Sequence, residues 1–189
     1  MVRRGTRYCR LTYPRVDAPG ETWAELGAGS GVFTAALSAL LGPDGTVYAT
    51  DRDIRAVKRL QALKTSGAAL HVQRADFTRP RDLSNLNDLD GVLLANALHF
   101  VPRQKRVLQQ LAQMLRPGGR PLVVEYDTFQ RTPWGPFPLP PERLQRSMQA
   151  SGLDDFSEVG RQPSRFSGRE LYAAVALRYY LPRVLGDRG

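Results

Sequence analysis

The chain has 189 residues, of which 42% are hydrophobic, and this length and composition suit one globular domain. Its only cysteine, Cys9, excludes an internal disulfide and a cysteine cluster for zinc. No apolar run reaches the roughly 20 residues needed to cross a bilayer, and the first residues lack the apolar segment of a signal peptide, so we expect a cytoplasmic protein.

The formal net charge of +9 is concentrated toward the two ends of the chain. Residues 1–20 carry five arginines against Asp17, residues 21–127 carry 13 basic and 11 acidic groups, and the remaining +3 follows residue 127. Basic ends suit an anionic substrate or RNA. However, 24 of the 27 basic residues are arginines, as is common in proteins from GC-rich genomes, so the charge alone does not indicate a nucleic-acid partner.

Runs of strand length alternate with helical patterns through the first half of the chain. A strand over residues 22–26 meets three glycines, and a helix follows with Val32, Ala36, Leu37, Leu40 and Leu41 on one stripe. A second strand is predicted over residues 46–51. A helix capped by Asp53 then repeats Ile54, Val57 and Leu60, and it leads into a third strand over residues 70–76.

The second half continues the alternation. A fourth strand is predicted over residues 89–96, a helix over 103–115, a turn at "RPGG", and a fifth strand over 120–127. Crossovers of this kind require parallel pairing, so we expect a doubly wound α/β sheet with its ligand crevice at the carboxyl ends of the strands. The segment "TPWGPFPLPPE", residues 132–142, is a proline-stiffened loop too long for a plain connection.

Gly27, Gly29 and Gly31 occupy alternate positions in the turn between the first strand and its helix. Glycines at such a turn allow a ligand to lie against the main chain. The dinucleotide-binding fingerprint needs a third small residue at position 32, where this chain has Val32. The spacing therefore disfavours a nicotinamide or flavin dinucleotide.

The stretch "ELGAGSG" resembles the acidic-x-Gly-x-Gly-x-Gly motif of class I S-adenosylmethionine-dependent methyltransferases of the kind that act on small molecules. Asp51 matches the family's ribose-binding acid, Asp76 its adenine-binding acid, and "ANALHF" its fourth motif, while "LRPGG" is a frequent family turn. The resemblance covers about residues 20–180. It implies S-adenosylmethionine as the cofactor, bound by Glu25, Gly27, Ala28, Gly29, Gly31, Asp51, Arg52, Asp76, Phe77, Asn96, Ala97 and Leu98.

The same resemblance completes the expected fold. It implies a single Rossmann-like sheet of seven strands, mostly parallel with the last strand antiparallel, and with helices on both faces. The final helix is expected over residues 141–153 and the last two strands over 154–161 and 170–180. We therefore divide the chain into a basic N-terminal extension (residues 1–20), a methyltransferase domain (21–181) and a C-terminal tail (182–189).

Methyl transfer from a sulfonium is an in-line displacement, so a base is needed only where the acceptor atom arrives protonated. His99, just beyond the fourth strand, is the candidate base, and Tyr126 is a second catalytic candidate. Asp127, Trp134 and Phe137 are the candidate substrate-binding residues, and no metal site is expected.

Asn96 is followed by Ala97 and Leu98 rather than by two prolines, which disfavours methylation of DNA amino groups. We expect a small organic acceptor, methylated at oxygen, nitrogen or carbon. The alternatives are an RNA or protein methyltransferase that uses the basic ends, and a cofactor-binding module without catalysis. The sequence does not indicate an oligomeric state.

Overall fold

The computed structural model describes residues 19–164 and 168–179. The five N-terminal arginines, Cys9 and the predicted tail lie outside these residues. The described elements are β1 (Thr22–Leu26), α2 (Val32–Leu41), β2 (Thr46–Asp51), α3 (Ile54–Gln61), β3 (Ala69–Arg74), η2 (Pro80–Leu83), β4 (Leu89–Ala95), η3 (Leu98–Phe100), α4 (Gln104–Met114), β5 (Leu115–Tyr126), α5 (Pro141–Gln149), β6 (Leu153–Pro163) and β7 (Glu170–Arg178).

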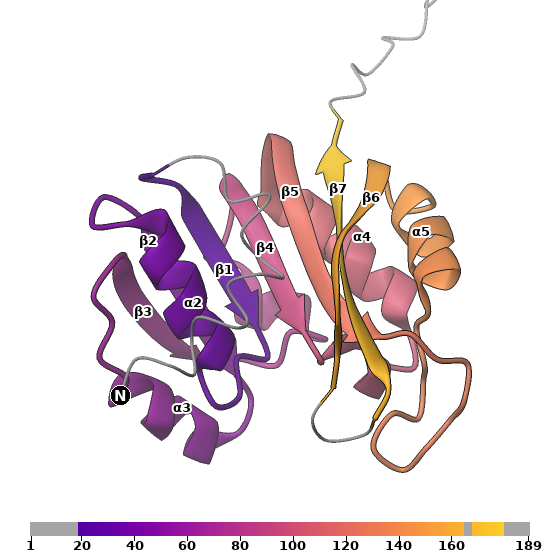
Figure 1. Ribbon diagram of the computed structural model, residues 1–189. Coiled ribbons are helices and arrows are strands. Elements are labelled where there is room, and N and C mark those ends of the chain that lie inside the picture. Colours follow the sequence, from indigo (N-terminus) through magenta and orange to yellow (C-terminus); the bar gives the residue numbers. More distant parts are fainter. Residues whose placement is uncertain (1–18, 165–167, 180–189) are drawn as a thin grey trace, which may run out of the picture.

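The strands form one seven-stranded sheet in the order β3-β2-β1-β4-β5-β7-β6 (Figure 1). The pairs from β3 to β5 are all parallel, whereas β7 runs antiparallel to both β5 and β6. Six strands therefore share one direction and the last one opposes them. This confirms the predicted Rossmann-like sheet.

Helices cover both faces of the sheet because successive strand residues point to opposite sides. In β5, Leu122 and Val124 pack with Leu37 of α2, whereas Val123 packs with Leu108 of α4. Figure 1 shows α2 in front of the sheet and α4 and α5 behind it. The central strands are thus buried on both faces and their sequences are largely apolar, whereas the residues of the edge strands β3 and β6 are mostly exposed or half-buried.

Several element boundaries differ from the sequence prediction. Leu115 begins β5 instead of ending α4. The ladder pairs Leu115 with Leu89 and Arg120 with Gly91, so residues 116–119 bulge out opposite Asp90. The third and fourth strands end at Arg74 and Ala95, short of the predicted polar residues. The polar residues in question, Asp76 and Asn96, therefore lie in the loops that follow these strands.

Three residues of the predicted helix stripes are less buried than expected. Ile54 is exposed, because it is the first residue of α3, and Val32 and Leu40 are half-buried near the two ends of α2. Asp53 caps α3 as predicted, since its Oδ1 accepts a hydrogen bond from the Arg55 amide. The stripe Val57 and Leu60 is buried as expected.

The chain order places a switch point between β1 and β4. The chain moves from β1 outward through β2 to β3, and it then returns to β4 on the other side of β1. In open α/β sheets, ligands bind beyond the carboxyl ends of the strands at such a point. None of the described helices is long and apolar enough to cross a membrane.

Candidate functional site

The loop after β1 has the main-chain conformation that its glycines predict. Gly27, Gly29 and Gly31 have φ angles of 77°, 57° and 77°, in the left-handed region that side chains disfavour. The amides of Gly27 and Ala28 both donate to the Thr50 carbonyl at 2.9 Å, which ties the loop to the end of β2. The loop is therefore a fixed turn at the switch point.

The loops after β3 and β4 meet this turn at Gly27. A Cβ atom at Gly27 would lie 3.2 Å from the Phe77 ring and 3.3 Å from Ala97 Cβ. A Cβ at Gly29 would meet only main-chain oxygen at 3.9 Å, so that side of the loop is open. The chain thus brings residues from β1, β3 and β4 together around a cradle without side chains. A surface of this kind allows a ligand to lie against the main chain.

Asp51 lies at the end of β2 and already holds two loops. Its Oδ2 accepts a hydrogen bond from the Gly29 amide at 2.8 Å, and its Oδ1 accepts one from the Asp53 amide at 2.8 Å. Each carboxylate oxygen can accept more than one hydrogen bond. The position thus fits the predicted ribose-binding role, and Arg52 next to it is exposed.

Glu25 is buried beneath the glycine loop, at the penultimate residue of β1. Thr34 of α2 donates a hydrogen bond to its Oε2. Burial is the main reason that the pKa of Glu25 rises from its ordinary 4.5 to about 8; the Thr34 hydrogen bond opposes this shift and the charge of Asp51 adds to it. Glu25 is therefore a neutral acid at pH 7.

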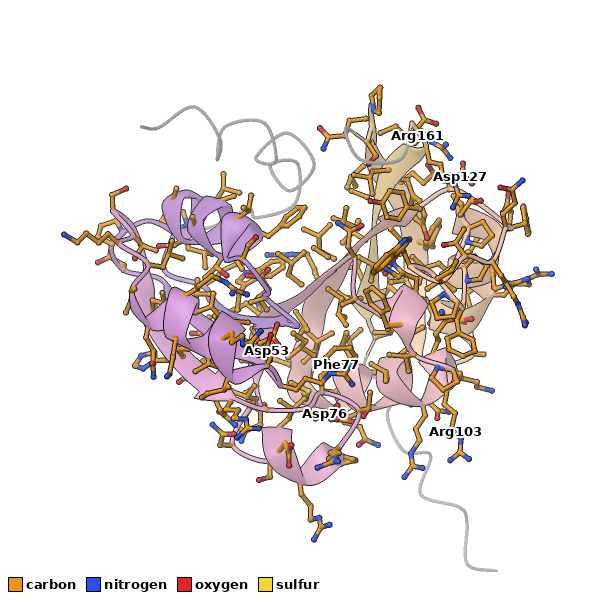
Figure 2. All side chains as sticks on the ribbon, turned by 90° about the horizontal axis from the view of Figure 1, so that it is seen from below. Asp53, Asp76, Phe77, Arg103, Asp127 and Arg161 are labelled. Atoms are coloured by element: carbon orange, nitrogen blue, oxygen red, sulfur yellow. The ribbon has the colours of Figure 1, made fainter. Side chains whose placement is uncertain are left out.

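Asp76 lies in the loop after β3, beside Phe77, and Figure 2 shows both near Asp53. Its Oδ1 accepts hydrogen bonds from the Thr78 amide at 3.0 Å and from the Thr78 hydroxyl at 2.7 Å. Although partial burial opposes ionisation, these bonds and two nearby arginines lower the pKa of Asp76. Asp76 thus stays an anion suited to accept from an amine.

Asn96 connects the glycine cradle to a cavity beyond β4 and β5. Its main chain is in the left-handed region, with φ 53°, and its amide donates to the Val124 carbonyl at 2.8 Å. Its side-chain Oδ1 is buried and has no hydrogen-bond partner in the described part of the chain. Buried polar atoms are usually paired, so this oxygen is suited to a donor on a bound ligand.

His99 and Glu125 form a buried pair. His99 Nδ1 lies 2.6 Å from Glu125 Oε2, and the two side chains are 6% and 1% exposed. Glu125 Oε1 also accepts hydrogen bonds from the Leu98 amide at 2.9 Å and the His99 amide at 3.3 Å. One carboxylate therefore fixes both the turn that carries His99 and the orientation of its ring.

This pair lines a cavity of about 460 Å³. Its described lining consists of Asn96, His99, Phe100, Glu125, Tyr126, Thr128, Gln130, Thr132, Trp134, Gly135, Pro138, Leu139 and Arg169. The proline-rich loop closes over His99: the Phe137 amide donates to the His99 carbonyl at 3.0 Å, and a Cβ at Gly135 would lie 3.8 Å from the His99 ring. The volume falls within the range of small-molecule sites.

The second catalytic candidate, Tyr126, lies at this cavity, but the predicted substrate-binding residues do not all do so. Tyr126 and Trp134 line it, and the Tyr126 ring lies 5.9 Å from that of His99. Phe137 is absent from the described lining, and only its main-chain amide contacts the site, through the hydrogen bond to the His99 carbonyl. Asp127 is also absent; its Oδ2 pairs with Arg161 Nη1 at 2.6 Å, and Figure 2 shows this pair well away from Asp76 and Phe77.

Sequence reasoning missed Glu125, Gln130 and Arg169. Glu125 had a signal, because it is the one charged residue between Leu122 and Tyr126 in an otherwise apolar strand. Its partner His99 is 26 residues away, so the pairing itself is not visible in the sequence. Arg169 lies beside the carboxyl end of β5 because β7, which begins at the next residue, pairs antiparallel with β5, and Gln130 follows β5 in the next loop. Among the described residues, no three His, Cys, Asp or Glu side chains gather as a metal site would.

Comparison with known proteins identifies the family. A family model described as a methyltransferase domain matches residues 24–120, which is half of the chain. The chain belongs to the class I S-adenosylmethionine-dependent methyltransferases. S-adenosylmethionine is the cofactor of this family, and the glycine cradle and the unpaired Asn96 oxygen fit it.

Two relatives of this methyltransferase are named ubiquinone/menaquinone biosynthesis C-methyltransferase UbiE. That of Pasteurella multocida is 31% identical over 57% of this chain and 40% of its own length. That of Erwinia tasmaniensis is 24% identical over 90% of this chain and 66% of its own length. The crystal structure of the CurJ carbon methyltransferase matches with a TM-score of 0.71 at 19% identity, over 87% of this chain and 50% of that one. The chain thus spans two thirds or less of these proteins.

Proposed function

We propose that this methyltransferase methylates a small organic acceptor at an atom that must first lose a proton, and that His99 is the base that removes it. The supporting observation is the buried pair of His99 and Glu125 at the wall of the cavity. An activated carbon is the first acceptor atom to test, because the two UbiE relatives are named C-methyltransferases and CurJ a carbon methyltransferase.

The pair determines which nitrogen of His99 can act as a base. A carboxylate only accepts hydrogen bonds, so the short contact to Glu125 Oε2 requires the proton on Nδ1. Nε2 then carries the lone pair that takes a proton from the acceptor. The imidazolium formed in this step is stabilised by the carboxylate that already faces it.

S-adenosylmethionine, when bound, supplies an electrophilic methyl group on a sulfonium. The work of the chain is then alignment and exclusion of water. Asp51, Asp76 and the glycine loop are the proposed cofactor contacts, together with Glu25, Ala28, Arg52, Phe77, Asn96, Ala97 and Leu98. Phe100, Tyr126 and Trp134 are the proposed walls for an apolar acceptor.

The test is a transfer assay with methyl-labelled S-adenosylmethionine and three acceptor classes: phenols, amines, and carbon acids such as 1,3-diketones. We expect labelled product with at least one class. We expect His99→Gln to lower that rate by about 10²-fold or more, which is the usual contribution of a general base. The binding of S-adenosylhomocysteine should not change, since His99 belongs to the acceptor cavity.

The chain offers a matched control for this variant. His71, the other histidine, lies in β3, where its ring stacks on Tyr48 with centroids 5.1 Å apart. His71→Gln should keep the wild-type rate. Full activity in His99→Gln would contradict the proposal, and so would a loss of the same size in His71→Gln.

A further inference from the structure

The charged side chains that line the cavity differ in how far the fold already engages them. Among the described residues of its lining, four have ionisable side chains: His99, Glu125, Tyr126 and Arg169. Glu125 is enclosed by His99 and two main-chain amides, so its charge is directed into hydrogen bonds within the fold. Arg169 therefore provides the permanent charge that a bound acceptor meets.

The fold holds Arg169 at this position through the start of β7. The Asp127 amide donates to the Glu170 carbonyl at 2.9 Å, and the Ser164 amide donates to the Arg169 carbonyl at 2.7 Å. These contacts join the end of β6, the end of β5 and the start of β7. The Arg169 main chain is thus fixed next to the carboxyl end of β5, where Tyr126 enters the cavity lining.

Gln130 orients the guanidinium group. Arg169 Nη2 donates to Gln130 Oε1 at 3.1 Å, and both side chains line the cavity. Because the carboxamide oxygen faces the arginine, the Gln130 Nε2 group is a second donor on the same part of the wall. A planar guanidinium beside an amide donor is well suited to bind the oxygens of a carboxylate or a phosphate.

The remaining lining is mostly apolar. Phe100, Tyr126, Trp134 and Leu139 contribute to it, and Phe100 and Trp134 are among the exposed large hydrophobic residues of the described chain. The cavity therefore combines aromatic walls, one base and one cation. An acceptor that satisfies all three has an apolar body, an acidic proton and an anionic group.

We infer that Arg169, oriented by Gln130, is a specificity residue that binds an oxyanion group, carboxylate or phosphate, on the acceptor. This inference rests on the proposed function, because it assigns the acceptor to the cavity of His99. A guanidinium beside an amide donor binds an anion more tightly than a neutral analogue of the same shape, since the neutral analogue cannot form charge-assisted hydrogen bonds with the guanidinium. Small acids with an aromatic or aliphatic body form the selected substrate class.

The test measures binding, so it does not depend on turnover. The probes are 3-phenylpropanoate, its neutral amide 3-phenylpropanamide, and phenyl phosphate, each titrated calorimetrically into the protein saturated with S-adenosylhomocysteine. We expect the acid or the phosphate to bind at least about tenfold more tightly than the amide. The comparison of 3-phenylpropanoate with phenyl phosphate decides between a carboxylate and a phosphate.

Arg169→Gln should abolish the preference for the anion and leave binding of the amide unchanged. Gln130→Leu should reduce the preference in part, because the guanidinium loses its orienting contact. Arg131→Gln is the matched control: Arg131 is exposed, neighbours Gln130 and is absent from the described lining, so this variant removes one positive charge near the cavity without removing a lining residue. Thermal melting and S-adenosylhomocysteine affinity report whether each variant is folded.

The inference is overturned if the wild-type protein shows no preference for either anion, or if the preference survives Arg169→Gln. An equal loss in Arg131→Gln also overturns it, because the effect would then be that of net charge. The two proposals fail separately. Suppose that the anion preference depends on Arg169 but His99→Gln transfers methyl groups at the full rate. The role of Arg169 in binding the anion would then be supported, and the role of His99 as the base would be refuted.

Discussion

The proposed base depends on the contact between His99 Nδ1 and Glu125 Oε2. In Glu125→Gln, an amide nitrogen facing His99 can only donate, so Nδ1 must accept and the proton moves to Nε2. The imidazole then cannot take a proton from the acceptor. We expect kcat to fall at least about tenfold, as happens when a histidine is held in the wrong tautomer.

The measurement is kcat as a function of pH, with S-adenosylhomocysteine affinity as the control for the cofactor side. A purely structural Glu125 would lower the thermal midpoint and leave the shape of the pH profile as it is. An undiminished kcat at every pH would show that the carboxylate does not set the tautomer.

Glu25 predicts a pH dependence of stability. Its pKa of about 8 in the fold exceeds its ordinary 4.5, so between these values the folded chain holds a proton that the unfolded chain has lost. The free energy of unfolding therefore decreases as the pH rises through this window, by at most about 1.4 kcal/mol per pH unit for one proton. Below pH 4.5 the stabilisation that comes from the proton on Glu25 is fully present.

Glu25→Gln removes this titration and keeps a neutral side chain of the same shape. Denaturant unfolding at pH 5 and pH 8 should show the wild type losing stability relative to the variant as the pH rises. The prediction fails if the difference between the two proteins is the same at both values.

At the scale of elements, β1 and β4 are joined by a contact that only glycine permits. A Cβ atom at Gly91 would lie 2.3 Å from the Trp23 ring, and Trp23 Nε1 donates to Glu21 Oε2 at 2.9 Å, which holds the ring in place. Overpacking of this kind typically costs about 1–3 kcal/mol. We expect Gly91→Ala to lower the free energy of unfolding by this amount or more.

Urea denaturation of Gly91→Ala, Trp23→Leu and the double variant measures the effect. Because the smaller side chain removes the clash, the double variant should be more stable than the sum of the single losses predicts. Strict additivity, or a Gly91→Ala protein as stable as the wild type, would contradict the contact.

The elements themselves were largely predictable, since strand and helix periodicity depends on near neighbours. Boundaries such as Leu115 were not, because a tertiary pairing with Leu89 extends β5 into the predicted end of a helix. The cofactor residues stay a prediction, and they come from the resemblance of continuous motifs near strand ends to those of the family. Glu125 and Arg169 were not predicted as site residues, because they reach the cavity through contacts between distant strands.

In the whole molecule, the loops that follow the parallel strands lie at the same edge of the sheet. They form two neighbouring parts of the site, the glycine cradle and the cavity of His99. The loops after β1, β3 and β4 meet at the glycine cradle, with Asp51 at the end of β2. The loops after β4 and β5, together with Arg169 before β7, line the cavity with His99. Asn96 lies where the two meet. We therefore expect that one substitution can disable cofactor binding and another can disable proton removal.

The most direct test compares Asp51→Asn and His99→Gln by two measurements on each: calorimetric affinity for S-adenosylhomocysteine, and kcat for methyl transfer at saturating cofactor. We predict that Asp51→Asn weakens affinity at least about tenfold, roughly 1.4 kcal/mol, while retaining most of kcat. His99→Gln should retain the affinity and lose kcat. A His99→Gln protein that transfers methyl groups at the wild-type rate would contradict the account.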